Sequence, residues 1–523
     1  MVLAIATTAT AQTAVTTYHN DNYRTGWNST ETLLTPANVT ASSFGLLVTV
    51  SVDDEVDGSP LVVPGVNITA GTSQGVHDVA YVVTANNTVY AIDASVGTVL
   101  LSNHLGTPVS WPLGCNNNGP NVGINSTPVI DIGSNTLYLI AYTKDGTGPA
   151  YRLHALDLGN LTDKITPVIV SGSHTLIDGT TFTFNATYQR QRPGLLMANG
   201  NIYAGFGSFC DFSANLSRGW LLGWNAATLA PLSANRVNDL QATSPNSFFL
   251  SSIWMSGYGP AADDSGNVLF VTGNSDYSGT TYDGVTNIQE SVVKVSSDLT
   301  TVVDLFTPSN QASLDKGDTD FGSGGVLVLP DQPGSMPHLA VAAGKYGTMY
   351  FMNEDSLGGY STTKNNVLGS YGVGPCWCGE SYFVDPNDGL ARVVSSGSNH
   401  VEVWKLQTTP KPTLTRVAQS NAIVTGQNGG FFTSVSSNGN SNPIIWALSR
   451  PVSAKLTSTV LHAFNPEATG GMTQIFRYVT GPWPYYIGDL NQVPVVANGK
   501  VYVATYKELQ IFGLKPPPKQ GSK

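Results

Sequence analysis

The chain has 523 residues, a formal net charge of −11 and a pI near 5.1, and only 11% of its residues are charged. It contains no basic stripe, which argues against a nucleic-acid surface, and no apolar stretch long enough to span a bilayer. Many short β-rich runs are separated by Gly, Asn and Asp turns, and long helical patterns are absent. This pattern predicts an all-β fold.

The first 43 residues precede the regular strand pattern. Residues 1–11 contain a short apolar run and an Ala-x-Ala arrangement at Ala9-Thr10-Ala11, which resembles the end of a signal peptide. We therefore expect a secreted protein, or one in the lumen of the secretory pathway. Residues 12–43 are polar and rich in turns, and we expect an extended arm lying over the body. At the other end, residues 515–523 predict a disordered tail.

Two segments far apart in the sequence each lack a partner. Residues 493–514 read as three short strands, with a tight turn at Asn498-Gly499. Three strands leave one edge of the sheet open, and exposed edges favour aggregation. The strand at 44–53 stands alone before the first repeat. We expect it to pair with the C-terminal strands and supply the fourth.

A sequence repeat of roughly fifty residues, with four predicted strands, recurs between these segments. Such a repeat is the signature of propeller blades. The sequence therefore predicts a single eight-bladed β-propeller over 44–514, with four-stranded antiparallel blades and a ring closed by residues 44–53. A fifth repeat loses its pattern near Leu357. The other full repeats span 59–106, 126–172, 192–237, 257–308, 380–420 and 432–479.

The sequence pattern of the repeats resembles that of the eight-bladed propellers related to pyrroloquinoline quinone (PQQ) dehydrogenases. The resemblance covers Asn20 to Leu514, although the tryptophan that this family places near the end of each repeat is missing from most blades. The whole chain is also similar to fungal secreted propellers, the hetero-Diels–Alderases of tropolonic sesquiterpene biosynthesis. The phrases that carry the repeat are VYAIDASVGTVL, LHALDLGNL, WLLGWNAATLAPL, LHAFNPEATGG and VANGKVYVAT.

Strand order places the loops that enter inner strands, and the loops that join second to third strands, on one face. The resemblance implies that the ligand funnel lies on that face. Four second-to-third loops are long, at Thr143–Tyr151, Ser208–Arg218, Asn274–Gln289 and Ser449–Thr459. We expect the cysteines to be oxidised and to pin these loops, with three pairings open. The cysteines, all on this face, are Cys115, Cys210, Cys376 and Cys378.

Glycosylation is permitted by Asn-x-Ser/Thr sequons. They begin at Asn28, Asn38, Asn67, Asn86, Asn125, Asn160, Asn185 and Asn215.

Side chains that open the inner strands, together with those of the adjoining loops, should rim the axis. Guanidinium groups can stabilise an oxyanion, buried carboxyls can act as acids or bases, and aromatic rings can stack on a flat substrate. Asp318 belongs to the same rim. We expect catalytic roles for Arg190, Arg192, Asp320, Glu380 and Arg450. We expect substrate contacts from Asp57, Asn125, Trp254, Tyr277, Tyr282, Lys345, Tyr346, His400, Asp489, Asn491 and Tyr506.

The favoured hypothesis is an enzyme that acts without a redox cofactor or metal on a small aromatic, tropolone-like molecule. The similarity to the hetero-Diels–Alderases implies dehydration of a hydroxymethyl tropolone to a quinone methide, followed by cycloaddition with a terpene. Such a reaction needs an acid for the leaving hydroxyl, cations for the tropolone oxygens and an apolar wall for orientation. The substrate itself and the oligomeric state are not specified by the sequence.

Two alternatives remain open. The first is an alcohol or sugar dehydrogenase with PQQ held on Ca²⁺, whose ligands would come from Asn125, Asp318, Asp320 and Glu380. Many such enzymes stack an adjacent Cys-Cys disulfide on the quinone, and Cys376–Cys378 is the nearest approach to one here. The second is a glycan- or protein-binding propeller, or a polysaccharide lyase. Its sugar-stacking candidates, expected to be exposed, are Trp111, Trp377, Trp483 and Tyr485.

Overall fold

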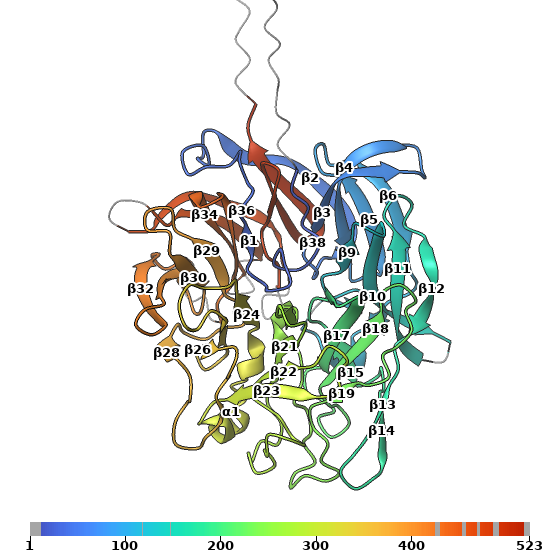
Figure 1. The fold of residues 1–523 in the computed structure, drawn as a ribbon. Helices are drawn as coiled ribbons and strands as arrows, with labels where there is room; N and C mark the ends of the chain where they lie inside the picture. Colours follow the sequence, from blue (N-terminus) through green and yellow to red (C-terminus); the bar gives the residue numbers. More distant parts are fainter. Residues whose placement is uncertain are drawn as a thin grey trace, which may run out of the picture.

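The computed structural model describes residues 12–117, 119–146, 148–423, 429–451, 457–467, 471–484 and 491–516. The expected leader at 1–11, and residues 517–523 of the expected tail, lie outside this range. Small antiparallel sheets surround a central axis and follow one another in chain order (Figure 1). Seven come from consecutive stretches and the eighth joins both ends of the chain. The predicted eight-bladed all-β propeller is confirmed.

Each blade runs from an inner strand beside the axis to an outer strand. Blade 1 contains β3 (Leu61–Ile68), β4 (Gly75–Val83), β5 (Thr88–Asp93) and β6 (Val99–His104). Blade 2 contains β9 (Val129–Asp131), β10 (Thr136–Asp145), β11 (Gly148–Asp157) and β12 (Asp163–Ile169). Blade 3 contains β16 (Leu196–Ala198), β17 (Asn201–Ser208), β18 (Trp220–Asn225) and β19 (Arg236–Val237), with β15 (Gln189–Gln191) also pairing β17. Blade 4 contains β20 (Ala261–Ala262), β21 (Val268–Val271), β22 (Val292–Val295) and β23 (Val302–Thr307), with β27 (Gly359–Tyr360) at its outer edge.

The remaining blades continue the order. Blade 5 contains β24 (Val326–Leu329), β25 (Leu339–Ala343), β26 (Thr348–Asn353) and β28 (Gly369–Gly372), so the repeat that loses its pattern near Leu357 is completed after a detour along blade 4. Blade 6 contains β29 (Ser381–Val384), β30 (Ala391–Ser395), β31 (Glu402–Gln407) and β32 (Thr413–Gln419). Blade 7 contains β33 (Phe432–Asn438), β34 (Ser441–Ser449), β35 (Ser458–Asn465) and β36 (Thr473–Pro482), with β1 (Trp27–Asn28) beside β33. Outside the blades lie two ribbons, β7 (Val109–Ser110) with β8 (Asn121–Val122) and β13 (Ser173–Thr175) with β14 (Thr181–Thr183), and the helices α1 (Gln311–Gly317), η1 (Pro112–Gly114), η2 (Met255–Gly257) and η3 (Phe321–Ser323).

The eighth blade closes the ring. Its strands are β37 (Val495–Ala497), β38 (Lys500–Leu514) and β2 (Phe44–Glu55), and β2 pairs antiparallel with β38 from Phe44↔Leu514 onward. Lys507 has a left-handed φ of 64° and separates the half of β38 that pairs with β37 from the half that pairs with β2. The predicted N-terminal closure is confirmed, with β2 ending at Glu55.

The core lies between blades, because a single blade cannot cover both of its own faces. Phe44 of β2 is completely buried and contacts Trp446 of blade 7 and Phe512 of its own blade, at ring-centroid distances of 5.6 Å and 6.4 Å. The closing strand is therefore held by side-chain packing as well as by its hydrogen bonds.

The arm is buried near the axis instead of lying over the body as expected. Val15, Tyr18 and Arg24 are each at most 2% exposed. Between Val15 and Asn28 the arm hydrogen-bonds once or more to the inner strand of every blade. Its partners, in blade order, are Val62, Ile130, Met197, Ala262, Val328, Tyr382, Val435 and Val496. The arm thus follows the ring of inner strands and seals the axis. The division into arm, propeller and tail stays a prediction.

Arg24 is the centre of this seal. Its guanidinium donates to the carbonyls of Tyr18, Leu195 and Pro260 at 2.8 Å, 3.1 Å and 2.8 Å. The Tyr258 hydroxyl donates to the Arg24 carbonyl at 2.9 Å and so links the arm to the loop that follows η2. In the part of the chain described, no helix has the length and apolar character needed to cross a membrane.

Candidate functional site

A cavity of about 320 Å³ lies at the amino ends of the inner strands, on the face that carries the long loops. Most of its lining residues precede inner strands, and the others lie at the ends of second strands or in the loops that follow them. The cavity therefore lies beyond the inner-strand residues to which the arm bonds. Six residues that the sequence analysis placed on the rim come together here: Arg190, Arg192, Trp254, Asp318, Asp320 and Lys345. Its lining is Asn117, Arg190, Arg192, Gly207, Ser208, Cys210, Asp211, Ser252, Trp254, Asp318, Asp320, Lys345 and Trp377.

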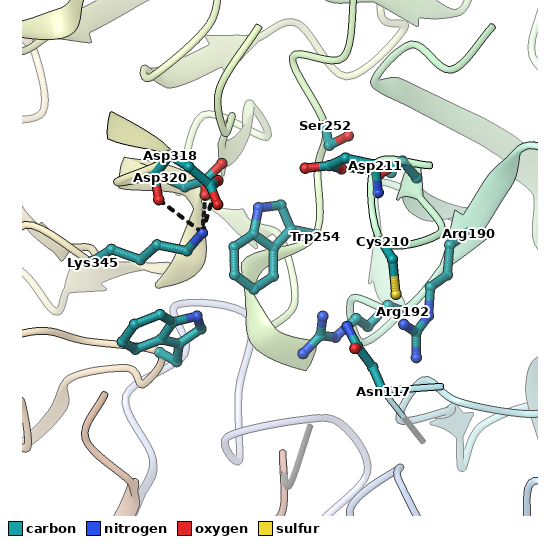
Figure 2. A pocket seen from close by; sticks show the side chains of 13 residues that line it. Asn117, Arg190, Arg192, Cys210, Asp211, Ser252, Trp254, Asp318, Asp320 and Lys345 are labelled. Carbon is teal, nitrogen blue, oxygen red and sulfur yellow. Dashed lines mark hydrogen bonds and ion pairs between the residues drawn. The ribbon is translucent and has the colours of Figure 1, made fainter. Parts of the chain in front are cut away.

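Lys345 and two aspartates form one side of the cavity (Figure 2). The ammonium group of Lys345 is 3.2 Å from Asp318 Oδ1 and makes a short ion pair with Asp320. Asp320 also accepts the Asn274 backbone N–H at 2.8 Å. Asp320 is 3% exposed, whereas the Asp318 side chain is 71% exposed at the mouth. The site therefore combines a buried carboxylate, which is ion-paired and hydrogen-bonded, with a carboxylate that solvent can reach.

Local backbone structure fixes this arrangement. Asp318 ends helix α1 in a left-handed conformation (φ 49°), which turns the chain toward Asp320 at the start of η3. Lys345 lies in the turn between β25 and β26, where its backbone N–H donates to the Asp320 carbonyl at 3.0 Å. The neighbouring Gly344 permits this approach, because a Cβ there would lie 2.6 Å from the backbone of Phe321.

The charges of the three groups are coupled. Burial would raise the pKa of Asp320, but Lys345 and the Asn274 N–H outweigh it and lower that pKa. Loss of solvation and the negative charge of Asp320 raise the pKa of Asp318. Burial would lower the pKa of Lys345, yet the two aspartates raise it. Environments that push two neighbouring carboxyls apart mark candidate acid and base partners. Of the two carboxyls, Asp318 therefore holds a proton more readily than Asp320, and the two aspartates favour the charged form of Lys345.

Glu290 lies behind Asp320 and is completely buried. It accepts the Phe321 N–H at 2.5 Å. Burial and the charge of Asp320 raise the pKa of Glu290, so the environment of Glu290 favours its neutral form, whereas that of Asp320 favours the ionised form.

Trp254 stands between the lysine side and the arginine side of the cavity (Figure 2). The Arg192 guanidinium lies 5.0 Å from its ring centroid and the Lys345 ammonium 5.4 Å from it. Both distances are within the range of cation–π attraction. Asn491 supports Arg192 from behind, with its amide oxygen 3.4 Å from Nη2. An aromatic face flanked by cations suits a flat, acidic molecule.

Two disulfides border the cavity and settle the open pairing. Cys115 bonds Cys210, with Cα atoms 5.6 Å apart, and Cys376 bonds Cys378, with Cα atoms 4.9 Å apart. The first joins the loop before blade 2 to the loop after β17. The second encloses Trp377, which lines the cavity.

Several predicted residues lie behind the cavity wall. Glu380 is 1% exposed, and its carboxylate accepts no hydrogen bond from the described part of the chain. Burial raises the pKa of Glu380 to about 7. Asp57 and Asn125 are buried and share a short hydrogen bond. The Arg450 guanidinium lies 6.0 Å from the Trp377 ring centroid. None of these four lines the cavity.

Other predicted residues have local partners. The Tyr282 hydroxyl shares a 2.7 Å hydrogen bond with Thr307, and His400 Nδ1 lies 3.0 Å from the Ser420 carbonyl. Tyr277 and Tyr346 are 54% and 60% exposed and do not line the cavity, and neither does Tyr506. Asp489 lies outside the described residues. The roles assigned to all these residues from the sequence stay predictions.

The sequence analysis did not single out Asn117, Ser208, Asp211 or Ser252. Asp211 lies at the cavity mouth, exposed by surface area but surrounded by protein at longer range. That desolvation, with the charge of Asp320, raises the pKa of Asp211 to about 6. The one signal in the sequence was its position beside Cys210 in a long loop of the correct face. Trp377 was noted as a stacking residue, and Asp318 as a rim residue.

A Ca²⁺ ion does not fit this donor set. Asp318 and Asp320 both face the Lys345 ammonium, which occupies the position a cation would take. Throughout the described ranges, no group of three or more His, Cys, Asp and Glu side chains is placed to hold a metal. The remaining expected ligands, Asn125 and Glu380, lie outside the cavity lining.

Comparison with known proteins places the fold. No protein-family model matches the chain, and no curated protein matches it. Among solved structures it is similar to the quinohemoprotein alcohol dehydrogenase of Comamonas testosteroni, with a TM-score of 0.63 and 14% identity over 98% of this chain and 83% of that one. For quinohemoprotein alcohol dehydrogenase ADHIIG of Pseudomonas putida HK5 the values are 0.63, 13%, 97% and 82%. A europium-containing methanol dehydrogenase gives 0.62, 12%, 96% and 98%.

At these identities the likeness concerns the fold alone. It confirms the predicted resemblance to the propellers of quinone-dependent dehydrogenases. None of the three is a hetero-Diels–Alderase, so that part of the resemblance stays a prediction.

Proposed function

We propose that the chain is an acid–base enzyme that binds a flat, oxygen-rich, acidic organic molecule in the axial cavity. One observation carries this proposal: the Asp318–Lys345–Asp320 arrangement lies beside the Trp254 ring, with Arg192 on its other side. The cations would hold the substrate oxygens and the indole would stack on its ring. We infer a secretory route from the two disulfides, which form and persist in oxidising compartments.

The reaction proposed is the loss of water from a hydroxymethyl tropolone. Asp318 donates its proton to the hydroxyl as the C–O bond breaks, and water leaves. The ring hydroxyl of the substrate then returns a proton to the carboxylate, so the acid is regenerated. Lys345 and Arg192 stabilise the negative charge on the ring oxygens while this occurs. The quinone methide formed adds to a terpene alkene by new C–C and C–O bonds, without further proton transfer.

The direct test is incubation of the protein with a hydroxymethyl tropolone and humulenol, analysed by mass spectrometry. The expected product has the summed mass of both reactants less one water. Asp318→Asn should abolish acceleration of water loss, whereas Asp78→Asn, in β4 of blade 1 and outside the cavity lining, should leave it unchanged. A wild-type rate equal to the buffer rate, with no binding of tropolone, would overturn the proposal.

A quinone-dependent dehydrogenase is the second candidate, because the three solved structures above share its fold and the cavity offers Trp254 and three cationic side chains. Arg190, Arg192 and Lys345 suit the carboxylates of PQQ, but the donor set does not fit the accompanying Ca²⁺. Titration with PQQ, followed by its visible absorption and by dye reduction with an alcohol, separates the two candidates. Alcohol-dependent dye reduction would favour the dehydrogenase.

The glycan-binding alternative loses one of its candidates. Trp483 was expected to be exposed but is 1% exposed, because it packs in the core between blades 7 and 8. Trp111 is 50% exposed, and Tyr485 lies outside the described residues. Polysaccharide lyase activity has no residue set in this cavity that favours it over the proposed reaction.

A further inference from the structure

Trp377 reaches the cavity from an unusually restrained segment. It is half-buried and lines the cavity, while the cysteines on either side of it are completely buried and bonded to each other. A disulfide that spans one residue removes most of the backbone freedom of that residue. The restraint therefore acts on a side chain that faces the ligand space.

The surroundings of this segment fix its orientation as well. The Trp377 N–H donates to the Gly429 carbonyl at 2.6 Å, and the Cys376 carbonyl accepts the Ser323 hydroxyl at 2.7 Å. A Cβ at Gly429 would overlap the Trp377 ring, so the indole packs directly against glycine backbone. Ser323 belongs to η3, next to Asp320, which connects this segment to the acidic side of the cavity.

The indole of Trp377 also shares a cation with Trp254. The Lys345 ammonium lies 5.8 Å from the Trp377 ring centroid and 5.4 Å from that of Trp254. A flat ligand held by Lys345 would meet an aromatic surface on each of these walls. Fixing the second wall in advance would reduce the entropy lost on binding.

We infer that the Cys376–Cys378 disulfide is a positioning device for ligand recognition, which acts by holding Trp377 in the cavity wall. The inference rests on the proposed function for the identity of the ligand class. Trp377 is the contact residue, and the two cysteines act through it. This role differs from that of Cys115–Cys210, which joins two separate loops.

The test is a double-mutant cycle, in which removal of the disulfide is measured with and without Trp377. Binding of tropolone and of PQQ is followed by calorimetry for wild type, Cys376→Ser/Cys378→Ser, Trp377→Ala and the triple variant. The disulfide variant should bind about tenfold more weakly than wild type. In the Trp377→Ala background the same change should have no further effect. Wild-type affinity without the disulfide, or an undiminished loss without Trp377, would overturn the inference.

Two further measurements test the positioning role of the disulfide, one without removing it and one without any ligand. Gly429→Ala retains the disulfide but places a methyl group against the indole, and it should weaken binding to a similar extent even if the serine variant does not fold. Acrylamide quenching, taken as the difference between each protein and its Trp377→Phe counterpart, reports the indole without any ligand. Quenching should rise when the disulfide is removed. If wild type binds neither probe, the proposed function fails, and unchanged quenching would then refute the positioning role separately.

Discussion

The ammonium group of Lys345 lies between two carboxylates and near two indole rings, so it connects the acidic and aromatic parts of the cavity. Lys345→Met should lower turnover of the hydroxymethyl tropolone about 100- to 1000-fold, as expected for loss of a group that stabilises developing negative charge. Steady-state kinetics gives the comparison, with Lys144→Met, near the end of β10 and outside the cavity lining, as the matched control. An equal loss in both variants would argue against a specific role for Lys345.

Glu380 makes a separate prediction at the same scale, because its carboxyl is buried and its pKa is raised from 4.5 to about 7. When the pKa of a carboxyl is higher in the folded protein than in the unfolded chain, the folded state binds the proton more tightly. The protein is therefore most stable below the unfolded-state pKa, and this stability is lost as pH rises through the folded-state pKa. Stability should therefore fall between about pH 4.5 and pH 7, by up to ~3 kcal/mol from this group.

Glu380→Gln cannot ionise, so it should remove that part of the pH dependence. Urea unfolding at pH 5 and pH 8 is the measurement. The variant should be close to wild type in stability at pH 5 and more stable than wild type at pH 8. A constant difference between the two proteins across this range would show that Glu380 does not titrate in the folded state as inferred.

Among the elements, the arm has the most unusual role, since one short segment bonds to the inner strand of all eight blades. Arg24→Met should destabilise the protein by about 3–5 kcal/mol, because several buried carbonyls lose a charged donor at once. Chemical unfolding measures the loss. Arg477→Met, on an exposed position of β36, is the matched control and should change stability little. Similar losses of stability in the two variants would mean that Arg24 is not needed to hold the arm against the inner strands.

At the scale of the whole molecule, the repeats were predictable because each blade is built from local alternation and short turns. Ring closure was predictable because a strand without a partner and a sheet without an edge stood at opposite ends of the sequence. The path of the arm was not, since its bonds are made by single residues to distant partners, such as Asn28 to Val496. No periodic pattern reports such contacts.

The candidate site was likewise predictable only in part. Arg192, Trp254 and Asp320 could be predicted because every blade brings the start of its inner strand to the axis. Tyr282 and His400 were placed on the rim by loop position alone. Each has a local hydrogen-bond partner and neither lines the cavity, so their substrate contacts stay predictions. Loops are positioned by specific contacts and disulfides, which the order of strands does not specify.

The N-terminal region has two roles: β2 closes the ring, and the arm bonds to the inner strands. A circular permutant can separate them. Lys515 N–H already donates to the Ser43 carbonyl at 2.8 Å, so a short turn can join residue 516 to residue 43. A chain running from 59 to 516 and then from 43 to 58 keeps the closing strand but lacks the arm. It should fold as a β-rich protein with one cooperative transition, at a lower Tm than wild type. It should bind tropolone weakly, because the inner strands that follow the cavity residues lose their hydrogen bonds to the arm.

A peptide of residues 12–42 added to the permutant should then raise both Tm and affinity. The matched control is the chain 59–516 without residues 43–58, whose eighth blade keeps an open edge. We expect this control to aggregate or to unfold without cooperativity. Circular dichroism, calorimetry and light scattering distinguish these outcomes. A control as stable as the permutant would mean that β2 is not required to close the ring, and a peptide without effect would mean that the arm does not act as a separable seal.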